Sequence, residues 1–215
     1  MFWFTADTHF NHGNIITYCN RRCYLTLEEK AAFDTYLLKP EESLRPKYSQ
    51  ESIERMNTSI FDNINSRVKV NHELWIHGDF CWAKYFGQVK ECRNRILCPN
   101  VHLILGNHDR FSFREYKEIF SSVSYYSEIN IQGIKVVLSH YPLLSWNGAD
   151  HGGIMLHGHV HFNANIEYIK TTIPNGKRLI DVGVDAVAGR RLLTTGSLTP
   201  EDYSPMSFSE ILALI

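Results

Sequence analysis

The chain has no cysteine framework. Its five cysteines are odd in number and form neither a CxxC pair nor the spacing of a zinc finger. This pattern argues against a disulfide-stapled scaffold and against a structural zinc site built on thiolates. Reduced thiols of a cytoplasmic protein are the expected state of all of them, namely Cys19, Cys23, Cys81, Cys92 and Cys98.

An excess of charge of either sign is also missing. Lysine and arginine number 22 and aspartate and glutamate 23, which gives a net charge of −1. Long nucleic acids and anionic membranes select basic surfaces, so an extended nucleic-acid partner is not expected. No apolar run approaches the roughly 20 residues of a membrane span, so no membrane partner is expected either. The first residues lack a basic segment and soon reach Asp7, which argues against a signal peptide.

The sequence of 215 residues contains no linker, repeat or low-complexity tract. Hydrophobic residues make up 44% of it. This length suits one domain, residues 1–215, with a core large enough to fold without staples. Strand-like and helix-like segments alternate in the first half, and strands dominate the second. The pattern predicts an α/β protein with a mixed sheet, or with two sheets packed face to face. The oligomeric state is left open.

The periodicity and the turn signals place the expected elements along the chain. Strands are predicted over residues 2–6, 73–77, 101–105, 129–131, 134–139, 154–156, 166–172 and 178–184, with turns at Gln132-Gly133 and at 174–176. Helices are predicted from the capping box at Thr26 to Leu38, along the stripe of Ile53, Met56, Ile60 and Ile64, over 83–96, and after a cap at Ser207. Residues 38–50 contain two prolines and must form a loop, either a flap over or beside a site or a solvated connector.

Polar residues follow five of these strands directly. They are Asp7, Asp79, Asn107, His140 and the run from His157 to His161. The ends of strands in α/β folds meet at one edge, where ligands bind, so these segments predict one composite site.

The candidate ligands in these segments are oxygen and nitrogen donors without a thiolate. Their number exceeds the four donors of a structural zinc site and suits two adjacent ions bridged by a carboxylate. Imidazole mixed with carboxylate favours a transition metal over magnesium or calcium. We expect Asp7 with His9, and His159 with His161, to project to one side of an extended chain. The full set is Asp7, His9, Asp79, Asn107, His140, His159 and His161.

The order of these blocks resembles that of the calcineurin-like metallophosphoesterases. The blocks are Asp7-Thr8-His9, Gly78-Asp79, Gly106-Asn107-His108-Asp109, Ser139-His140 and Gly158-His159-Val160-His161. The segment from Asp7 to Ile15 resembles a small prokaryotic and phage branch of predicted phosphohydrolases. The resemblance implies a sandwich of two mixed β-sheets flanked by helices. It also implies two divalent transition-metal ions, with Mn2+ foremost and Fe, Ni, Co or Zn as alternatives.

The same resemblance implies a role for each residue. Asp7, His9 and His161 would hold the first ion, and Asn107, His140 and His159 the second. Asp79 would bridge both ions, His108 would be the catalytic histidine, and Asp109 would orient it. The implied reaction is hydrolysis of a small phosphomonoester or phosphodiester through a metal-bridging hydroxide.

Several neighbouring residues have two readings. His12 either contacts substrate or supports the site, or else it is a surface histidine. Arg21 and Arg22 either bind a phosphate of the substrate or are solvated charges. Cys81 senses oxidation or is a packed thiol. His157 is expected to support the ligands, and Asp185 to cap a strand end near the site without binding metal.

Phe80, Cys81 and Trp82 add apolar bulk after Asp79, where many family members carry a small or basic residue. The histidines outside every motif are read as structural or surface residues. They are His72, His77, His102 and His151.

Two other functions stay open at this point. A nuclease acting on DNA or RNA ends would share the blocks, although the near-neutral charge argues against a long nucleic-acid track. A catalytically silent scaffold would normally show decay in at least one block, and none has decayed.

Overall fold

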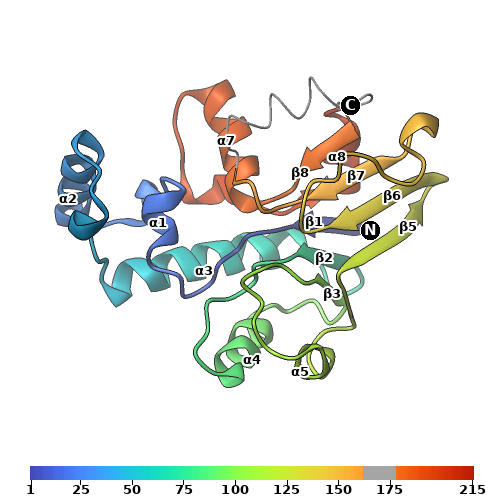
Figure 1. The fold of residues 1–215 in the computed structure, drawn as a ribbon, viewed down its shortest axis with the longest axis horizontal. Helices are drawn as coiled ribbons and strands as arrows, with labels where there is room; N and C mark the ends of the chain where they lie inside the picture. Colours follow the sequence, from blue (N-terminus) through green and yellow to red (C-terminus); the bar gives the residue numbers. More distant parts are fainter. Residues whose placement is uncertain (162–177) are drawn as a thin grey trace.

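The computed structural model describes residues 1–161 and 178–215, and its centre is a pair of β-sheets (Figure 1). The first sheet has the strand order β4-β3-β2-β1-β9 and the second β5-β6-β7-β8. Both sheets mix parallel and antiparallel pairs and are flanked by helices, which confirms the predicted fold class. The strands are β1 Phe2–Thr5, β2 Glu73–His77, β3 Val101–Ile104, β4 Ser122–Ser124, β5 Tyr126–Ile131, β6 Ile134–Ser139, β7 Ile154–His157, β8 Leu179–Asp181 and β9 Met206–Ser207.

The first sheet is parallel from β4 to β1, and only β9 runs antiparallel to its neighbour. Strands of a parallel sheet are covered on both faces, which is why β1 to β3 read as short apolar runs without polar alternation. The carboxyl ends of β1, β2 and β3 lie at the same level of the sheet, because Thr5 of β1 pairs with Ile76 of β2, and Ile76 pairs with Leu103 of β3.

The second sheet begins with the predicted hairpin. Its turn residues Gln132 and Gly133 have φ values of 55° and 83°, the positive values that a tight two-residue hairpin turn requires. Strand β6 then continues the sheet through parallel pairs with β7, and β7 pairs with β8. The ends of β6 and β7 therefore point the same way and deliver their following residues to one edge.

A hydrophobic core lies between the two sheets. Alternate side chains of β1, β2 and β3 meet alternate side chains of β6, β7 and β8, as the period of two in a strand dictates. This core is made mainly by Phe4, Trp75, Ile104, Val136, Leu138, Ile154, Leu156 and Ile180. Burial of these side chains fixes the two sheets relative to each other. The carboxyl ends of β1 to β3 therefore lie close to those of β6 and β7.

Helices cover the other face of the first sheet. The predicted apolar stripe lies on α3, where Met56, Ile60 and Ile64 are buried against that sheet. The helices are α1 Ile15–Tyr18, α2 Leu27–Leu38, α3 Gln50–Arg67, α4 Phe86–Asn94, α5 Phe113–Lys117, α7 Val184–Thr195 and α8 Phe208–Leu212. Short 3-10 turns lie at Arg22–Tyr24, Glu42–Leu44, Ala149–His151 and Pro200–Asp202.

Several predicted elements have other bounds in the structure; the strand predicted over 129–131, for example, is the longer β5. The helix predicted over 83–96 is the shorter α4, and it begins only after Tyr85, whose backbone is extended. The strand predicted over 178–184 stops at Asp181, and helix α7, which the sequence analysis did not predict, begins at Val184. The predicted strand 166–172 and the turn at 174–176 lie outside the described residues.

The loop over residues 38–50 joins α2 to α3, as predicted, and α2 lies at the end of the molecule farthest from the sheets (Figure 1). Arg45 in this loop stacks on the Tyr18 ring at 4.9 Å, and Tyr48 hydrogen-bonds to Thr17. Tyr18 lines the cavity described below, whereas no residue of the loop does. The loop thus contacts the wall of the cavity from outside, and its flap role stays a prediction.

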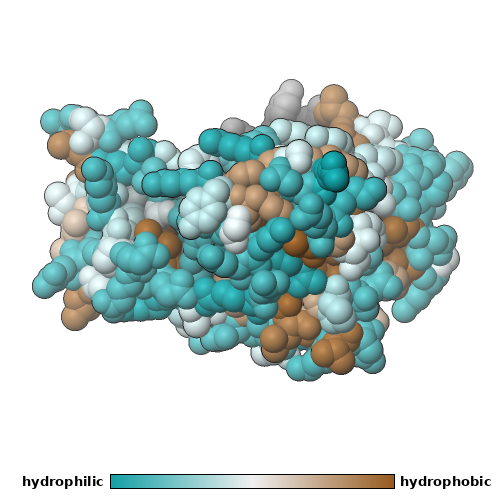
Figure 2. Space-filling view, turned by 90° about the horizontal axis from the view of Figure 1, so that it is seen from below, coloured by the Kyte–Doolittle hydropathy of each residue, from teal (hydrophilic) through white to brown (hydrophobic). Residues whose placement is uncertain are grey.

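The surface drawn in Figure 2 is mostly hydrophilic, and its hydrophobic residues form small separate patches. Among the residues that the structure describes, none of the helices combines the length and the apolar character needed to span a membrane.

Candidate metal centre

The structure brings all seven predicted metal ligands to one edge of the sheet pair. Asp7 follows β1, Asp79 follows β2, and Asn107 follows β3. His140 comes directly after β6, and His159 and His161 follow β7. Six of these seven residues fall into two groups of three that share this edge. A third group in the described part of the chain, Cys19, His161 and Asp185, shares His161 with the first and includes a thiol that the sequence analysis did not single out.

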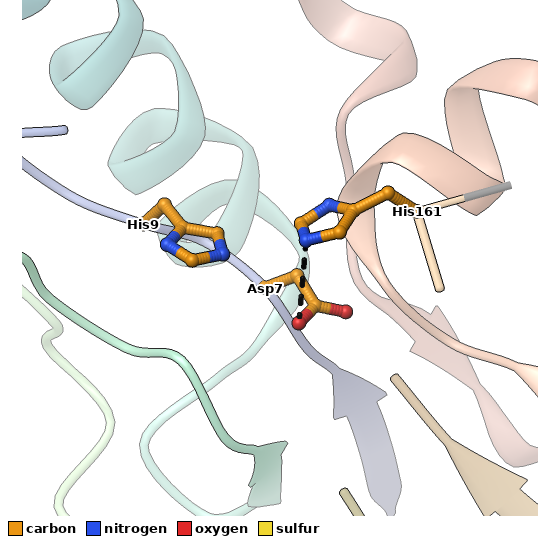
Figure 3. A group of neighbouring side chains, drawn as sticks. All are labelled: Asp7, His9 and His161. Atoms are coloured by element: carbon orange, nitrogen blue, oxygen red, sulfur yellow. Dashed lines mark ion pairs between the residues drawn. The ribbon is translucent and has the colours of Figure 1, made fainter. Parts of the chain in front are cut away.

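The first group is Asp7, His9 and His161, which converge on one space with their polar atoms facing inward (Figure 3). One ligand atom from each lies within 4.8 Å of the others. His161 Nε2 is 4.0 Å from Asp7 Oδ1, and the His9 and His161 rings stack with centroids 5.1 Å apart.

The second group is Asp79, His140 and His159, again with one ligand atom from each within 4.8 Å of the others. Asn107 joins it, because its Oδ1 lies 2.9 Å from Nε2 of His140. His140 Nδ1 donates to the His77 carbonyl at 2.8 Å, and burial lowers the pKa of His140, so the ring is neutral. Its Nε2 then carries a lone pair that faces the lone pairs of Asn107 Oδ1, an arrangement that a shared cation would stabilise.

Asp79 connects the two groups. Its Oδ2 is 3.5 Å from His9 Nε2 in the first group and 3.6 Å from His140 Nε2 in the second. Its Oδ1 accepts a hydrogen bond of 2.8 Å from the His108 backbone N–H, which fixes the carboxylate plane. The Asp79 carboxylate therefore lies within reach of cations at either ligand group.

The backbone at the ligands is not extended, so that part of the prediction is wrong. Five ligand residues have positive φ, an uncommon conformation for residues with a side chain. The values are 54° at Asp7, 47° at His9, 53° at Asp79, 73° at His159 and 47° at His161. The strain costs on the order of 1 kcal/mol or more for each residue and persists only where the surroundings enforce it. His159 and His161 lie in different groups.

Two glycines allow the close approach of the segments. A Cβ on Gly106 would lie 2.3 Å from Asp79 Oδ1, and one on Gly158 would lie 2.5 Å from Asp7 Oδ2. Both distances are far below a van der Waals contact. The glycines of the GNHD and GHxH blocks are therefore needed for packing around the carboxylates.

The donor atoms fit cations. Asp7 Oδ1 and His9 Nε2 are buried, and neither has a hydrogen-bond partner among the described residues. Burial raises the pKa of Asp7 well above its usual range, and burial lowers the pKa of His9 well below it. A buried carboxylate oxygen without a partner is costly, and a bound divalent cation would remove that cost. Oxygen and nitrogen donors of this kind suit Mn2+ or another transition metal.

Asp185 orients His161 from the opposite side. Its Oδ2 accepts a hydrogen bond of 2.7 Å from His161 Nδ1, which leaves Nε2 free to face Asp7. Burial lowers the pKa of His161, but Asp7 and Asp185 outweigh this effect and raise it to about 12. A cation at Nε2 would displace the proton there. Asp185 lies in the first turn of α7 and does not cap a strand, which corrects the prediction.

Arg21 is not available to substrate, and both readings of it were wrong. Its side chain is fully buried and forms a double ion pair with Asp185, with two distances of 2.8 Å. It also donates to the carbonyls of Asp7 and Thr8. Arg21 therefore holds Asp185 and the turn that carries Asp7. Arg22, in contrast, is exposed and pairs with Asp34, in line with the solvated reading.

Replacing Arg21 by methionine should lower the free energy of unfolding by about 3–5 kcal/mol, because the buried Asp185 carboxylate would lose its double ion pair and keep only the hydrogen bond from His161. The measurement is urea unfolding with a chelator present, which removes any contribution from bound metal. Arg22→Met is the matched control, since it breaks an exposed ion pair and should change stability little. Equal losses in the two variants would contradict a structural role for the Arg21–Asp185 pair.

Asp109 does not orient the His108 ring. Its carboxylate accepts backbone hydrogen bonds from Gly106 and Asp79 at 2.9 Å and from Phe80 at 3.1 Å. Burial raises the pKa of Asp109 to about 7, although the backbone N–H groups offset part of the rise. The residue ties the turn after β2 to the turn after β3, and so fixes the positions of Asp79 and Asn107. This corrects the orienting role implied by the resemblance.

A cavity of about 950 Å³ opens beside the two ligand groups. His12 lies in its wall and stacks on Trp82, with ring centroids 4.2 Å apart and an angle of 8° between the planes. Burial lowers the pKa of His12 to about 4, so its ring is neutral at pH 7. The surface reading of His12 is therefore wrong, and contact with substrate stays a prediction. Polar and aromatic groups share the lining, which includes His9, His12, Tyr18, Trp82, His108, His159, His161 and Tyr203.

The residues after Asp79 divide between core and cavity. Phe80 and Cys81 are buried, whereas Trp82 lines the cavity. The Cys81 sulfur lies 3.4 Å from the Cys92 sulfur, and this contact together with burial raises the pKa of the Cys81 thiol. A thiol that stays protonated is a weak nucleophile, which favours the packed reading of Cys81.

The remaining histidines lie outside the two ligand groups. His72 accepts a hydrogen bond from Trp3, His102 stacks on Trp75, and His151 is exposed. His77 is buried, and its contribution to the site is the carbonyl that orients His140. His157 is buried as well, and its Nδ1 lies 2.9 Å from the Gly158 carbonyl oxygen, within the turn that carries His159.

Comparisons with known proteins support the fold and name no activity. No family model matches the chain. The chain is 27% identical over 212 residues to the uncharacterized protein MJ1445 of Methanocaldococcus jannaschii, and the match covers 98% of this chain and 88% of that protein. The crystal structure of AQ665 from Aquifex aeolicus, a protein of unknown function, matches with a TM-score of 0.60 and 21% identity, over 100% of this chain and 99% of that chain. The chemistry must therefore be argued from the site itself.

Proposed function

We propose that this protein is a dinuclear metal-dependent phosphoesterase that hydrolyses a small phosphomonoester or phosphodiester. The observation that carries the proposal is the position of Asp79, whose Oδ2 lies 3.5 Å from His9 of one ligand group and 3.6 Å from His140 of the other. A structural metal site needs one closed set of about four ligands, whereas two groups joined by a carboxylate serve metal-ion catalysis on phosphoryl oxygens.

Seven side chains of the protein would hold the two ions. Asp7, His9 and His161 would bind one ion, and Asn107, His140 and His159 the other, with Asp79 between them. Two divalent cations, when bound, lower the pKa of a water molecule and take up charge on the phosphoryl group. The seven ligands include only two carboxylates, so the loaded site would carry net positive charge and favour an anionic ester.

His108 would supply a proton. Its side chain is 32% exposed and lines the cavity, and its Nε2 is 4.0 Å from Asp79 Oδ2. A group at this place can reach a leaving oxygen of an ester bound at the ions. Because the backbone N–H of His108 is bound to Asp79 Oδ1, the ring position is tied to that of the bridging carboxylate.

The cavity volume supports a small substrate, and the free thiols support a cytoplasmic location. A volume of about 950 Å³ admits a small phosphoester, and the net charge of −1 offers no field for a long nucleic acid. All five cysteines are free thiols, and we place the reaction in the cytoplasm, where thiols stay reduced.

Metal content and turnover of a chromogenic bis-aryl phosphodiester test the proposal together. Protein loaded with Mn2+ should hold two ions per chain and hydrolyse the diester, and a chelator should abolish the activity, because the ions supply the attacking water. Aryl monoesters, cyclic nucleotides and short oligonucleotides assayed in parallel would identify the ester class. Protein that binds two ions and turns over none of these compounds would instead be a silent scaffold, and the proposed function would be wrong.

A further inference from the structure

A second, smaller pocket of about 400 Å³ adjoins the cavity. The two hollows share Trp82 and His108 as a common wall, and the smaller one is further lined by Ala83, Lys84, Arg110 and Phe111. His108 therefore faces both the metal centre and this pocket. Because His108 is the proposed proton donor, the leaving group of an ester bound at the ligand groups would lie on the side of this pocket.

The described residues that line the pocket bring positive charge to it. They include Lys84 and Arg110, and none of them is a carboxylate residue. Neither side chain forms an ion pair with any residue in the described ranges, whereas nearby Lys90 pairs with Glu118 and Arg95 with Glu54. Two cations without a counter-charge in one concave space are the electrostatic requirement for binding an anion.

The position of the Arg110 side chain is defined by stacking. Its guanidinium lies 4.5 Å over the Trp82 ring, a distance at which the cation is attracted to the π face. Trp82 is itself held by the parallel His12 ring at 4.2 Å. A stacked guanidinium keeps its N–H fork free at the edges, and that fork matches the oxygens of a phosphate in a two-point contact.

We propose that the Lys84–Arg110 pocket binds a second phosphate group of the substrate, carried by the part that leaves. The natural substrates are then phosphoesters whose leaving group bears a further phosphate, and aryl esters without one are poor mimics. This inference rests on the proposed function, because it takes the metal centre as the place where the ester bond breaks. Lys84 adds a mobile charge, and together the two cations match a phosphate dianion.

The dinucleotide TpT and its forms with a terminal 5′- or 3′-phosphate test the inference. Each contains one diester, and the nucleoside products of its cleavage are separated from any loss of the terminal phosphate, which is a monoester. The form whose terminal phosphate lies on the departing nucleoside should show a kcat/KM for diester cleavage about tenfold above that of TpT, the size of a charge-assisted hydrogen-bond pair. In Lys84→Gln and Arg110→Gln the ratio of kcat/KM for this form to kcat/KM for TpT should fall toward one, mainly because KM for the phosphorylated form rises. Arg114→Gln is the matched control, because Arg114 is exposed outside the pocket and the ratio should be retained.

A binding measurement on metal-free protein separates this inference from the proposed function. Calorimetric titration with thymidine 3′,5′-bisphosphate should show binding that Arg110→Gln weakens about tenfold and Arg114→Gln does not. Hydrolysis of TpT with equal rates for all three dinucleotides would overturn the pocket assignment and leave the phosphoesterase intact. Absence of turnover on every ester, with bisphosphate binding that depends on Arg110, would overturn the proposed function and retain the phosphate pocket. Binding that is unaffected by both pocket variants would overturn the inference.

Discussion

Asp79→Asn should remove the activity of the metal-loaded protein and lower its metal content below two ions per chain. The substitution keeps the shape of the side chain and deletes the one negative charge that faces both ligand groups. Changes in residues that merely support metal ligands lower affinity about 10–100-fold, so loss of a shared ligand should cost at least as much. Metal analysis after dialysis and turnover of a bis-aryl diester measure the two effects.

A matched control for this variant is Asp62→Asn on α3. Asp62 is exposed and lies outside the cavity, so the same chemical change should leave metal content and turnover as they are. Circular dichroism with a chelator present should show that both variants fold. If Asp79→Asn retained two ions and full turnover, Asp79 would not bridge, and the two ligand groups would have to act separately.

The location of the site could be predicted from the sequence because it depends on local signals. Each ligand block comes directly after an apolar strand, and parallel strands deliver their carboxyl ends to one edge. Asp7, Asp79 and Asn107 follow three adjacent strands of the first sheet, so their proximity follows from the strand order alone. To place His140 and His159 at the same site, one must also predict that the two sheets pack with the carboxyl ends of these strands side by side.

The partners around the ligands could not be predicted, since they depend on packing between distant segments. Arg21 and Asp185 are 164 positions apart and meet only because α7 packs across the site edge. Helix α7 itself was missed, because Asp181-Val182-Gly183-Val184 reads as the end of a strand. The signals that could have revealed it are the buried pair Val184 and Ala188 at helical spacing and Gly196, a glycine that ends the helix with a φ of 74°.

The role of Asp109 shows a second limit. The family resemblance implied that the Asp109 side chain orients the His108 ring. The chain turns there, and the Asp109 carboxylate points back to the backbone N–H groups of Gly106 and Asp79. The bond from Gly106 is local, whereas those from Asp79 and Phe80 come from a segment 30 and 29 positions away, which the hydrophobic periodicity of the sequence does not reveal.

His108→Ala should keep both metal ions and lose most of the turnover of an alkyl or nucleoside ester. The ring lies beside the ligand groups and is not a member of either, while its backbone N–H, which the variant retains, holds Asp79. A general acid contributes roughly 10²–10⁴-fold, and its contribution grows as the leaving group becomes harder to expel. The loss should therefore shrink for a nitrophenyl ester, because nitrophenolate departs with little need of a proton.

The comparison of the two ester types separates three roles of His108. A large loss on the alkyl ester and a small loss on the nitrophenyl ester would establish proton donation, and equal losses would indicate that the imidazole stabilises charge on the phosphoryl group. A lower metal content would make His108 a ligand and contradict the grouping of Asp79, His140 and His159. His151→Ala is the control, since His151 is exposed and lies outside the cavity, and its rates on both esters should match those of the unchanged protein. Among the described residues, Asp109 accepts hydrogen bonds from the backbone of Gly106, Asp79 and Phe80. Asp109→Asn should therefore affect both esters to the same extent, which distinguishes the proton donor from the residue that holds its turn.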